Sequence, residues 1–316
     1  MVERRKLGRS GLVVSRLCLG TLTIGPLQAN LTLAEGARVI RTALEEGIDF
    51  IETADSYRTY DYIRRALVGW TQPVVIASRS YDYTYDGMRD RVEKALQELN
   101  RDYIDLFMLH EQESRLTLQG HAPALEYLAA AKETGKVRAI GVSTHVVEVV
   151  QACAEHPIID VVQPIVNVAG LGIKGGTLQD MLAAMSALRQ AQRGVYAMKP
   201  LGGGNLLKRF SQAWEFVLNL DCLDAIAVGM KTPAEVKANV RIIKGEQKPE
   251  DISVAMAVKE KHLHISDWCQ GCGRCAQRCR QRALYLRDGK MHVDHDRCLL
   301  CGYCAAVCPE FCIKVV

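Results

Sequence analysis

Eight cysteines toward the end of the chain repeat one spacing twice. Each copy has the form C-x2-C-x2-C-x3-C, and Pro309 follows the second copy. The first copy comprises Cys269, Cys272, Cys275 and Cys279, and the second comprises Cys298, Cys301, Cys304 and Cys308. Thiolates at this spacing are the ligands of cubane iron–sulfur clusters, and a duplicated run predicts two clusters.

The fourth cysteine of each copy is spaced to reach the cluster of the other copy. We therefore expect one 4Fe-4S cluster on Cys269, Cys272, Cys275 and Cys308, and a second on Cys298, Cys301, Cys304 and Cys279. Arg280 stands where proline is more usual, which removes no ligand, and Cys312 is expected to be a packed thiol. The stretch resembles a bacterial two-cluster ferredoxin domain.

Zinc and disulfides are the other common uses of clustered cysteines. Structural zinc takes four ligands, usually as two well-separated pairs, and leaves the evenly spaced triplets unexplained. Disulfides need an oxidising compartment, which nothing else in the sequence indicates. Clusters are therefore the favoured interpretation, with zinc as the remaining alternative.

The residues between the two copies predict a small hairpin. Asp288-Gly289 stands between short apolar runs at 283–286 and 291–293, and such a pair is a strong signal for a tight turn between strands. A segment this short cannot bury a sufficient core, so the metal centres are expected to replace that core.

Length and charge limit what the rest of the chain can be. The chain has 316 residues, and its formal net charge of +4 counts all 12 cysteines as neutral. There is no apolar run of about 18 residues, no apolar signal-peptide core, and no basic stretch interleaved with aromatic residues. We therefore expect a cytoplasmic protein without membrane or nucleic-acid partners.

Short β-rich runs alternate with helical patterns before the cysteine region. Strands are predicted at 17–20, 48–51, 74–77, 104–108, 137–141, 160–163, 195–198 and 225–228. Helices are predicted at 37–44, 88–99, 124–133, 146–154, 178–190, 211–219 and 233–243. About eight β–α units predict an α/β fold, a TIM (β/α)8 barrel. No G-x-G-x-x-G follows the first strand, which argues against a doubly wound dinucleotide-binding sheet.

In such a barrel the chemistry lies just past the carboxyl ends of the strands. Polar and ionisable side chains occupy these positions on successive predicted strands: Glu52, Tyr57, Arg79, His110, Ser143, Thr144, Gln163 and Lys199. Each of them alone has a structural explanation, such as a packed aromatic ring or a satisfied core histidine. Their occurrence at the same end of successive strands predicts an active site.

Four ordered stretches connect this ring of residues to a known family. They are R-K-L-G-R-S-G-L-V-V-S at 5–15 with L-G-T at 19–21, G-I-D-F-I-E-T-A-D-S-Y at 47–57, D-Y-I-D-L-F-M-L-H at 102–110, and G-K-V-R-A-I-G-V-S-T at 135–144. They resemble the aldo-keto reductases, and the similarity continues to about residue 243. The cysteine domain lies outside the common family pattern.

The resemblance assigns the catalytic roles of Asp, Tyr, Lys and His. Tyr57 matches the proton-donating tyrosine, and His110 matches the histidine that orients the carbonyl. Glu52 stands where aspartate is usual and Arg79 where lysine is usual, which preserves the charge of the pair. A guanidinium spreads its charge over a planar fork and gives up no proton, unlike an ammonium. Carbonyl reduction is expected, with a reduced rate or a different reaction as the alternative.

The resemblance also implies a nicotinamide site. Ser143 and Gln163 match positions that bind the carboxamide, and Thr144 stands where asparagine is common. Met198 stands where many members stack a tyrosine on the nicotinamide, and its thioether could pack there less specifically. The predicted cofactor contacts are Ser143, Thr144, Gln163, Met198, Lys199, Gly229, Glu235 and Asn239.

The rest of the dinucleotide is predicted to lie along the loops after the last two strands. Lys199 and Gly202-Gly203-Gly204 offer a cation and backbone N–H groups to a pyrophosphate. Glu235 aligns with the arginine that holds the 2′-phosphate of NADP(H), so a carboxylate there favours NAD(H). Lys231 and Lys237 lie nearby in the sequence and weaken this preference.

The two halves together give three hypotheses. The first is an oxidoreductase, linked to NAD(P), that acts on a small carbonyl or alcohol, with clusters that exchange electrons with a ferredoxin, a flavoprotein or a bound flavin. The alternative is an electron-transfer protein or subunit whose barrel has lost carbonyl reduction and is a scaffold. In the third the clusters are purely structural.

The domains are predicted as a barrel at 1–245, a linker at 246–265 with a short helix near 254–261, and a small α+β ferredoxin-like domain at 266–316. The sequence leaves open whether this last domain covers the barrel mouth.

Overall fold

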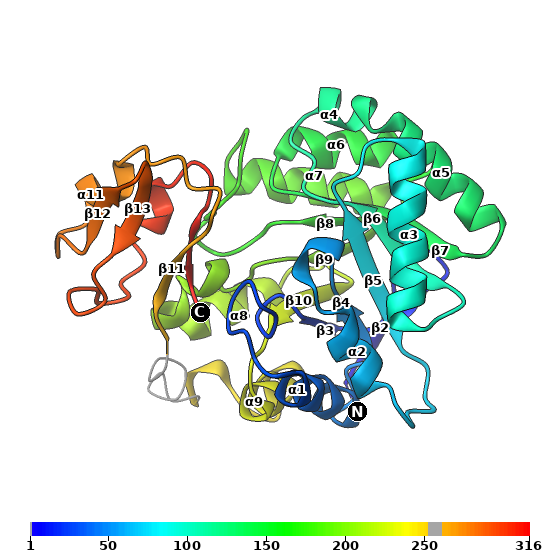
Figure 1. Ribbon diagram of the computed structural model, residues 1–316, viewed down its shortest axis with the longest axis horizontal. Helices are drawn as coiled ribbons and strands as arrows, with labels where there is room; N and C mark the ends of the chain where they lie inside the picture. Colours follow the sequence, from blue (N-terminus) through cyan, green and yellow to red (C-terminus); the bar gives the residue numbers. More distant parts are fainter. Residues whose placement is uncertain (1, 252–260) are drawn as a thin grey trace.

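Eight parallel strands close into a barrel in the computed structural model, which describes residues 2–251 and 261–316 (Figure 1). The order around the barrel is β10-β3-β4-β5-β6-β7-β8-β9. The strands are β3 (Leu17–Gly20), β4 (Phe50–Glu52), β5 (Val75–Ser80), β6 (Ile104–Leu109), β7 (Val137–Thr144), β8 (Val161–Pro164), β9 (Gly194–Ala197) and β10 (Ala225–Gly229). The predicted TIM barrel is confirmed, and each predicted strand overlaps an observed one.

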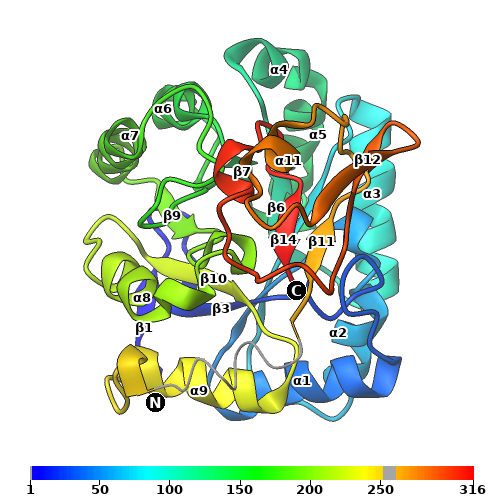
Figure 2. The same cartoon turned by 90° about the vertical axis from the view of Figure 1, so that its left-hand side faces the viewer.

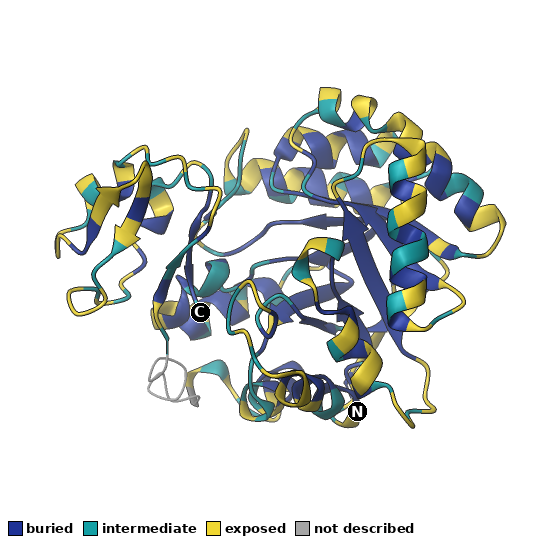
Figure 3. Cartoon of the chain, viewed as in Figure 1, coloured by how far each residue is buried: buried dark blue, intermediate teal, exposed yellow. Residues whose placement is uncertain are grey.

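The barrel strands are buried on both faces. Every residue of β3, β4, β5, β6, β8 and β9 is buried, as the dark strands of Figure 3 show. Inside the barrel, the rings of Phe50 and Tyr196 pack at 5.0 Å between centroids, beside Leu106 and Met108. Parallel strands that are buried on both faces are mostly apolar for this reason, and the polar residues of β4, β5 and β8 lie at or near their carboxyl ends.

Helices surround the barrel, with buried residues toward it and exposed residues on their outer sides (Figure 3). They are α1 (Leu33–Glu45), α2 (Tyr60–Ala66), α3 (Tyr85–Leu99), α4 (Arg115–Gly120), α5 (Ala122–Glu133), α6 (Val147–Glu155), α7 (Leu178–Gln190), α8 (Phe210–Leu218) and α9 (Pro233–Ile243). The sequence did not predict α2 and α4, which are short. Within the described ranges, no helix has both the length and the hydropathy to cross a bilayer.

An N-terminal hairpin closes the amino end of the barrel. Strands β1 (Arg4–Lys6) and β2 (Val13–Ser15) pair antiparallel. Leu7 and Leu12 belong to the same buried cluster as the residues inside the barrel. The strands have their carboxyl termini at the opposite end, which is where barrels of this kind have their active sites.

The C-terminal domain consists of two short antiparallel sheets. Strands β12 (Leu284–Arg287) and β13 (Lys290–Val293) form the predicted hairpin. Its turn residues, Asp288 and Gly289, have φ of 50° and 73°, as the favoured two-residue hairpin turn requires. The other sheet pairs β11 (Leu263–Ile265) with β14 (Ile313–Val315). Short helical turns, α11 (Arg274–Arg278) and η5 (Ala305–Val307), complete the domain.

Strand β11 falls within the range predicted as the linker, 246–265. Residues 244–248 leave α9, and the short 3-10 turn η4 (Pro249–Asp251) follows them. The helix predicted near 254–261 lies outside the described residues except for Lys261. Pairing of β11 with β14 joins the start of the C-terminal domain to the end of the chain.

The C-terminal domain lies over the carboxyl end of the barrel, in front of it in Figure 2. Strand β14 runs along the 3-10 turn η2 (Gly202–Gly204), where Asn205 Nδ2 donates to the Ile313 carbonyl at 2.9 Å. A second contact joins Lys208 Nζ to the carbonyl of Leu299 at 2.8 Å. The domain therefore covers the barrel mouth. The sequence alone could not answer whether it does.

A substitution at Gly204 would measure how much the contact between β14 and η2 stabilises the fold. Its φ is +84°, and a Cβ there would lie 2.0 Å from the Val315 carbonyl oxygen. Gly245 has φ +69° with open space around the same position. Both Gly→Ala variants carry the left-handed strain, and Gly204→Ala adds a backbone clash of about 1–3 kcal/mol.

We therefore expect Gly204→Ala to lower the unfolding midpoint, and to increase proteolysis between the two domains, clearly more than Gly245→Ala does. Thermal unfolding and limited proteolysis of the anaerobic protein measure both effects. Equal losses in the two variants would mean that β14 does not hold the domain on the barrel.

Candidate functional site

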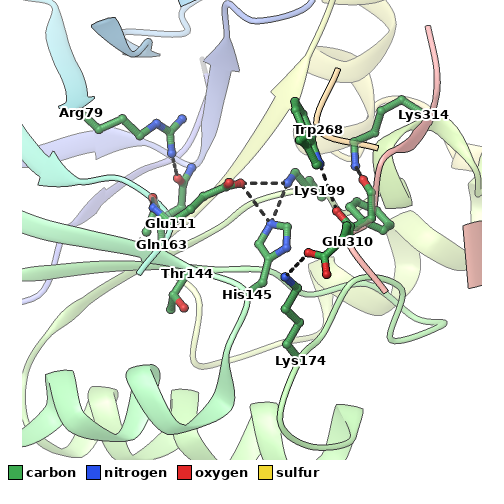
Figure 4. A network of polar contacts seen from close by, with 12 residues as sticks. Arg79, Glu111, Thr144, His145, Gln163, Lys174, Lys199, Trp268, Glu310 and Lys314 are labelled. Atoms are coloured by element: carbon green, nitrogen blue, oxygen red, sulfur yellow. Dashed lines mark hydrogen bonds and ion pairs between the residues drawn. The ribbon is translucent and has the colours of Figure 1, made fainter. Parts of the chain in front are cut away.

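Three buried side chains form a closed polar triangle at the barrel mouth. Glu52 ends β4, Arg79 lies in β5 and Gln163 lies in β8. Arg79 Nη2 lies 2.8 Å from Glu52 Oε2. Arg79 Nη1 donates to Gln163 Oε1 (Figure 4), and Gln163 Nε2 donates to Glu52 Oε2. The predicted Glu–Arg pair therefore exists, with Gln163 as its third member.

Arg79 keeps its charge within this triangle. Burial is the largest single influence and opposes the charge, but Glu52, with smaller contributions from Tyr57, Tyr196 and Glu111, more than offsets burial and raises the pKa of Arg79 above its ordinary value. Its Nε has no hydrogen-bond partner among the described residues. Arg79 is thus a fixed cation whose Nε–H is available to donate a hydrogen bond.

Tyr57 and His110 lie next to the triangle. Tyr57 ends the 3-10 turn η1 (Asp55–Tyr57), and His110 follows β6. The Arg79 Cζ lies 5.5 Å from the centroid of the Tyr57 ring. The rings of Tyr57 and His110 meet edge to face at 5.7 Å, and Tyr81 stacks on the other side of His110 at 4.1 Å. All four predicted catalytic residues are therefore brought together.

Burial sets the protonation states of the two rings. It raises the pKa of Tyr57 far above its ordinary value, although the charge of Arg79 opposes the shift. Burial, and then the charge of Arg79, lower the pKa of His110 to about 3. At neutral pH Tyr57 is therefore a protonated phenol and His110 a neutral imidazole. His110 Nδ1 is buried without a hydrogen-bond partner among the described residues.

A second polar cluster, Glu111–His145–Lys199, adjoins these rings (Figure 4). Lys199 Nζ lies 2.7 Å from His145 Nε2 and 3.6 Å from Glu111 Oε1, and His145 Nε2 lies 3.5 Å from the same oxygen. Tyr81 donates its hydroxyl to Glu111 at 3.0 Å. Sequence reasoning missed Glu111 and His145, although each follows a predicted site residue directly.

Burial and mutual charge act on this cluster in opposite senses. Burial lowers the pKa of Lys199, and the charge of Glu111 only partly restores it. Burial would raise the pKa of Glu111, but the charges of Lys199 and His145 keep that pKa below its ordinary value. The carboxylate is ionised at neutral pH and holds the ammonium at the barrel mouth. Lys199 has φ 58°, a strained conformation typical of functional loops.

The predicted carboxamide contacts are engaged within the protein. Ser143 Oγ accepts from the Glu111 N–H at 2.9 Å. Thr144 Oγ1 donates to the Gln112 carbonyl at 2.6 Å. The amide of Gln163 is held between Arg79 and Glu52. These side chains offer few free groups to a nicotinamide.

The remaining predicted cofactor contacts lie on two different parts of the barrel, at the ends of β9 and β10 and on helix α9. Met198 is buried directly after β9, and Gly229 ends β10. Glu235 and Asn239 lie on α9, where Glu235 accepts from the Lys231 N–H at 2.7 Å and pairs with Lys261 at 3.2 Å. Asn239 donates to the Glu235 carbonyl at 2.9 Å. Glu235 is thus part of the N-terminal turn of its helix and already has a cation beside it.

Four of the cysteines surround one cavity in the C-terminal domain. Cys269, Cys272, Cys275 and Cys308 line it, together with Cys312 and apolar groups from β11 and β14. Burial, and then the neighbouring thiols, raise the pKa of Cys275 to about 11. The N–H groups of Gly271 and Cys312 donate to the sulfurs of Cys269 and Cys308, at 3.5 and 3.2 Å. This is the set of ligands that the spacing predicted for the first cluster, with the crossed fourth cysteine.

The other four cysteines also act on one another. Burial raises the pKa of Cys298, and the thiols of Cys301 and Cys279 add to the shift. Burial, Cys301 and Cys298 raise the pKa of Cys304 to about 12. Thiols that repel one another as thiolates suit a cationic metal core, which removes the repulsion. Both predicted ligand sets fit a cluster.

A cavity of about 360 Å³ lies between the barrel mouth and the C-terminal domain. Tyr81, Glu111, Gln112, Glu113, His145, Val146, Lys174 and Lys199 line it from the barrel, and Trp268, Gln270, Glu310, Phe311 and Lys314 line it from the other domain. Trp268 adjoins Cys269, and Glu310 and Phe311 closely follow Cys308. The cavity thus lies between Tyr81, whose ring stacks on His110, and residues that adjoin the first set of cysteines in the sequence.

Removal of single thiols tests the ligand assignment. Cys308→Ala removes the fourth ligand of the first set, so we expect about half of the roughly eight irons per chain to be lost. Cys312→Ala removes a neighbouring buried thiol and is expected to keep the full content. Iron and sulfide analysis of anaerobically purified protein measures the difference. Equal iron loss in both variants would contradict the assignment.

Acid unfolding tests the burial of His110. Its pKa of about 3 in the folded protein lies below the ordinary 6.5, so the unfolded chain binds the proton first. The stability from neutral His110 is therefore complete above about pH 6.5 and is lost as the pH falls toward 3, by at most about 1.4 kcal/mol per pH unit.

His110→Gln is therefore expected to show a weaker loss of unfolding free energy between about pH 7 and pH 5 than the parent protein does. His292→Gln, on the exposed face of the C-terminal hairpin, is the matched control and should follow the parent. Urea unfolding at each pH gives the free energies. A His110→Gln protein with the parent's pH slope would exclude a strongly shifted histidine.

Comparisons with known proteins agree with this geometry. The profile of the Aldo/keto reductase family matches residues 16–215, and that of the 4Fe-4S dicluster domain matches residues 268–312. L-galactose dehydrogenase of Arabidopsis thaliana is 23% identical over 67% of this chain and 70% of its own length. The 6-dehydroglucose reductase of Novosphingobium aromaticivorans is 26% identical over 71% and 76%.

A solved aldo-keto reductase structure from Pseudomonas aeruginosa superposes with a TM-score of 0.66 at 25% identity, and the match covers 76% of this chain and 93% of that one. The family profile spans most of the barrel strands and every polar residue that the sequence predicted at their carboxyl ends, from Glu52 to Lys199. The chain therefore belongs to the aldo/keto reductase family and is an oxidoreductase with a C-terminal 4Fe-4S dicluster domain.

Proposed function

We propose that the protein reduces a small carbonyl compound, or oxidises the corresponding alcohol, at the barrel mouth, with electrons exchanged through its clusters. The observation that carries this proposal is the shared cavity. Tyr81, which stacks on His110, lines it from one side, and Trp268 and Phe311 line it from the cluster domain. The cavity is therefore one ring away from His110 on the barrel side, and its other wall is formed by residues that adjoin the first set of cysteines in the sequence.

Tyr57 is proposed as the general acid and base. In carbonyl reduction two electrons and two protons convert C=O to CH–OH: one proton passes from the Tyr57 hydroxyl to the carbonyl oxygen, and the other is taken up from water at the carbonyl carbon. His110, neutral and with an unpartnered Nδ1, orients that oxygen. Arg79 beside the phenol ring stabilises the phenolate that forms, and Glu52 fixes Arg79 in place.

The electrons are proposed to come from the two clusters. When bound, each 4Fe-4S cluster passes one electron, so two clusters match the two electrons of carbonyl reduction. The first set of cysteines lies next to the cavity wall through Trp268, and a ferredoxin or flavoprotein would reload the clusters from outside. A bound flavin is the alternative link between single electrons and the pair.

A nicotinamide fits the described residues less well than the clusters do. Gln163 is held by Arg79 and Glu52, and β14 lies along Gly203 and Gly204. The preference of Glu235 for NAD(H) over NADP(H) thus remains a prediction from the sequence. The same engaged groups favour the second candidate, an electron-transfer protein with a scaffold barrel.

Substitutions of Tyr57 and Tyr60 distinguish the carbonyl reductase from the electron-transfer protein. Tyr57→Phe is expected to lower kcat by about 10²–10⁴ with any accepted aldehyde or ketone, because the positioned proton is lost. Tyr60→Phe, whose buried hydroxyl hydrogen-bonds Ser78 at 2.6 Å, should cost stability and leave kcat unchanged. Anaerobic assays with reduced methyl viologen, and in parallel with NADH and NADPH, measure both variants.

Unchanged turnover in Tyr57→Phe would reject carbonyl chemistry at this phenol. If the variant and the parent also reduced a ferredoxin equally well without any accepted carbonyl compound, the scaffold alternative would be favoured. Iron and sulfide content of each variant shows that the clusters are intact in the comparison.

A further inference from the structure

The cavity between the two domains has an uneven distribution of charge. Its wall carries three lysines, His145 and three glutamates. Lys174 pairs with Glu310 at 3.0 Å and with Glu113 at 3.5 Å. Lys199 faces Glu111. The ammonium of Lys314 is then left without a carboxylate within 4.0 Å among the described residues.

A lysine ammonium without a neighbouring carboxylate is unusual in the protein interior, and Lys314 is only 6% exposed. It comes from β14, and its Nζ donates to the Phe311 carbonyl, which uses one of its three N–H groups. The Nζ also lies 3.3 Å from the centroid of the Phe311 ring. Burial of an ammonium without a counter-charge is costly, so an anion in the cavity would stabilise it.

Lys199 approaches the same ring from the barrel. Its Nζ lies 5.3 Å from the Phe311 centroid. The two ammonium groups, one from each domain, are therefore close to one another and repel. Burial, and then the charge of Lys199, hold the pKa of Lys314 well below its ordinary value. One carboxylate between them would relieve both the repulsion and the loss of solvation.

We propose that Lys199 and Lys314 bind a carboxylate of the substrate, so that the substrate is an oxo acid or the corresponding hydroxy acid. This inference rests on the proposed carbonyl chemistry and names the substrate class. Strand β14 lies along Gly203 and Gly204, where a dinucleotide pyrophosphate was expected, which favours a small carboxylate over a phosphate cofactor. The cavity volume of about 360 Å³ is at the small end for ligand sites, as a small acid requires.

The site is built from both domains. Glu111 and His145 hold Lys199 from the barrel side, while Phe311 places Lys314 from the cluster domain. Tyr81 spans the space between the cavity and His110. An acid bound by its carboxylate at the two lysines would therefore lie in the same cavity as Tyr81, whose ring stacks on His110.

Matched acids and esters test this proposal by binding rather than by turnover. The probes are 2-oxopentanoate and 4-oxopentanoate, each compared with its methyl ester, and inorganic pyrophosphate. Anaerobic calorimetry on the intact protein gives the dissociation constants. We expect Lys314→Met to weaken binding of the better acid about 10-fold to 100-fold and to leave its ester unchanged. Lys290→Met, an exposed lysine of the same domain that donates to the Asp267 carbonyl, is the control and should bind like the parent.

Each outcome decides the question. Acid binding that is equal in Lys314→Met and Lys290→Met would overturn the proposal. So would tighter, Lys314-dependent binding of pyrophosphate, which would make this a cofactor site. A Lys314→Met protein that changes only the cluster spectrum and potential would assign the lysine to the cluster alone.

The Tyr57→Phe protein separates this inference from the proposed function. If it keeps Lys314-dependent acid binding but loses turnover, both stand. If turnover does not depend on Tyr57 while acid binding still depends on Lys314, the carboxylate site stands and the catalytic assignment fails.

Discussion

The contact of β14 with the loop after β9 is the constraint on which the arrangement of this molecule depends. The last strand of the chain runs along a turn of three successive glycines. At Gly204 no side chain could fit, because a Cβ would lie 2.0 Å from the Val315 carbonyl oxygen. Close approach of two backbones is a use that only glycine allows. This contact fixes the cluster domain over the barrel mouth, brings Phe311 and Lys314 into the cavity, and orients the first cysteine set toward it.

Beneath this contact, the barrel mouth has buried charges of its own that must be paired. In the triangle of Glu52, Arg79 and Gln163, the guanidinium needs more acceptors than one carboxylate supplies, since it has five N–H donors in a fixed fork. Gln163 provides the second acceptor and returns a hydrogen bond to Glu52. Replacement of an Asp–Lys pair by Glu–Arg thus involves a third residue, which is drawn away from cofactor binding. Removal of one member would leave a buried charge unpaired, which is strongly destabilising.

The sequence predicted this site to an uneven degree. The cysteine spacing and the ends of the barrel strands were enough to predict two ligand sets and four residues that the fold brings together, because these patterns are local and regular. Glu111 and His145 were missed because their importance comes from Lys199, which is far along the chain and meets them only when the barrel closes. The partner of Gly202–Gly204 was also hidden. Strand β14 lies about a hundred residues later, and a glycine run alone indicates close approach without indicating what approaches.

The folding of the cluster domain and the position of its cysteines depend on the same contacts. Apart from the strands that touch the barrel, its buried apolar residues are few, chiefly Ala283, Leu284 and Met291, and most of its surface is exposed (Figure 3). A core this small needs metal ligation or a neighbouring surface to be stable. The barrel supplies that surface through β14, and two clusters would supply the ligation. Gln270 and Glu310 line both the cavity of the first cysteine set and the cavity at the barrel mouth, so a domain that folds in this way has the predicted ligands of its first cluster close to the barrel mouth.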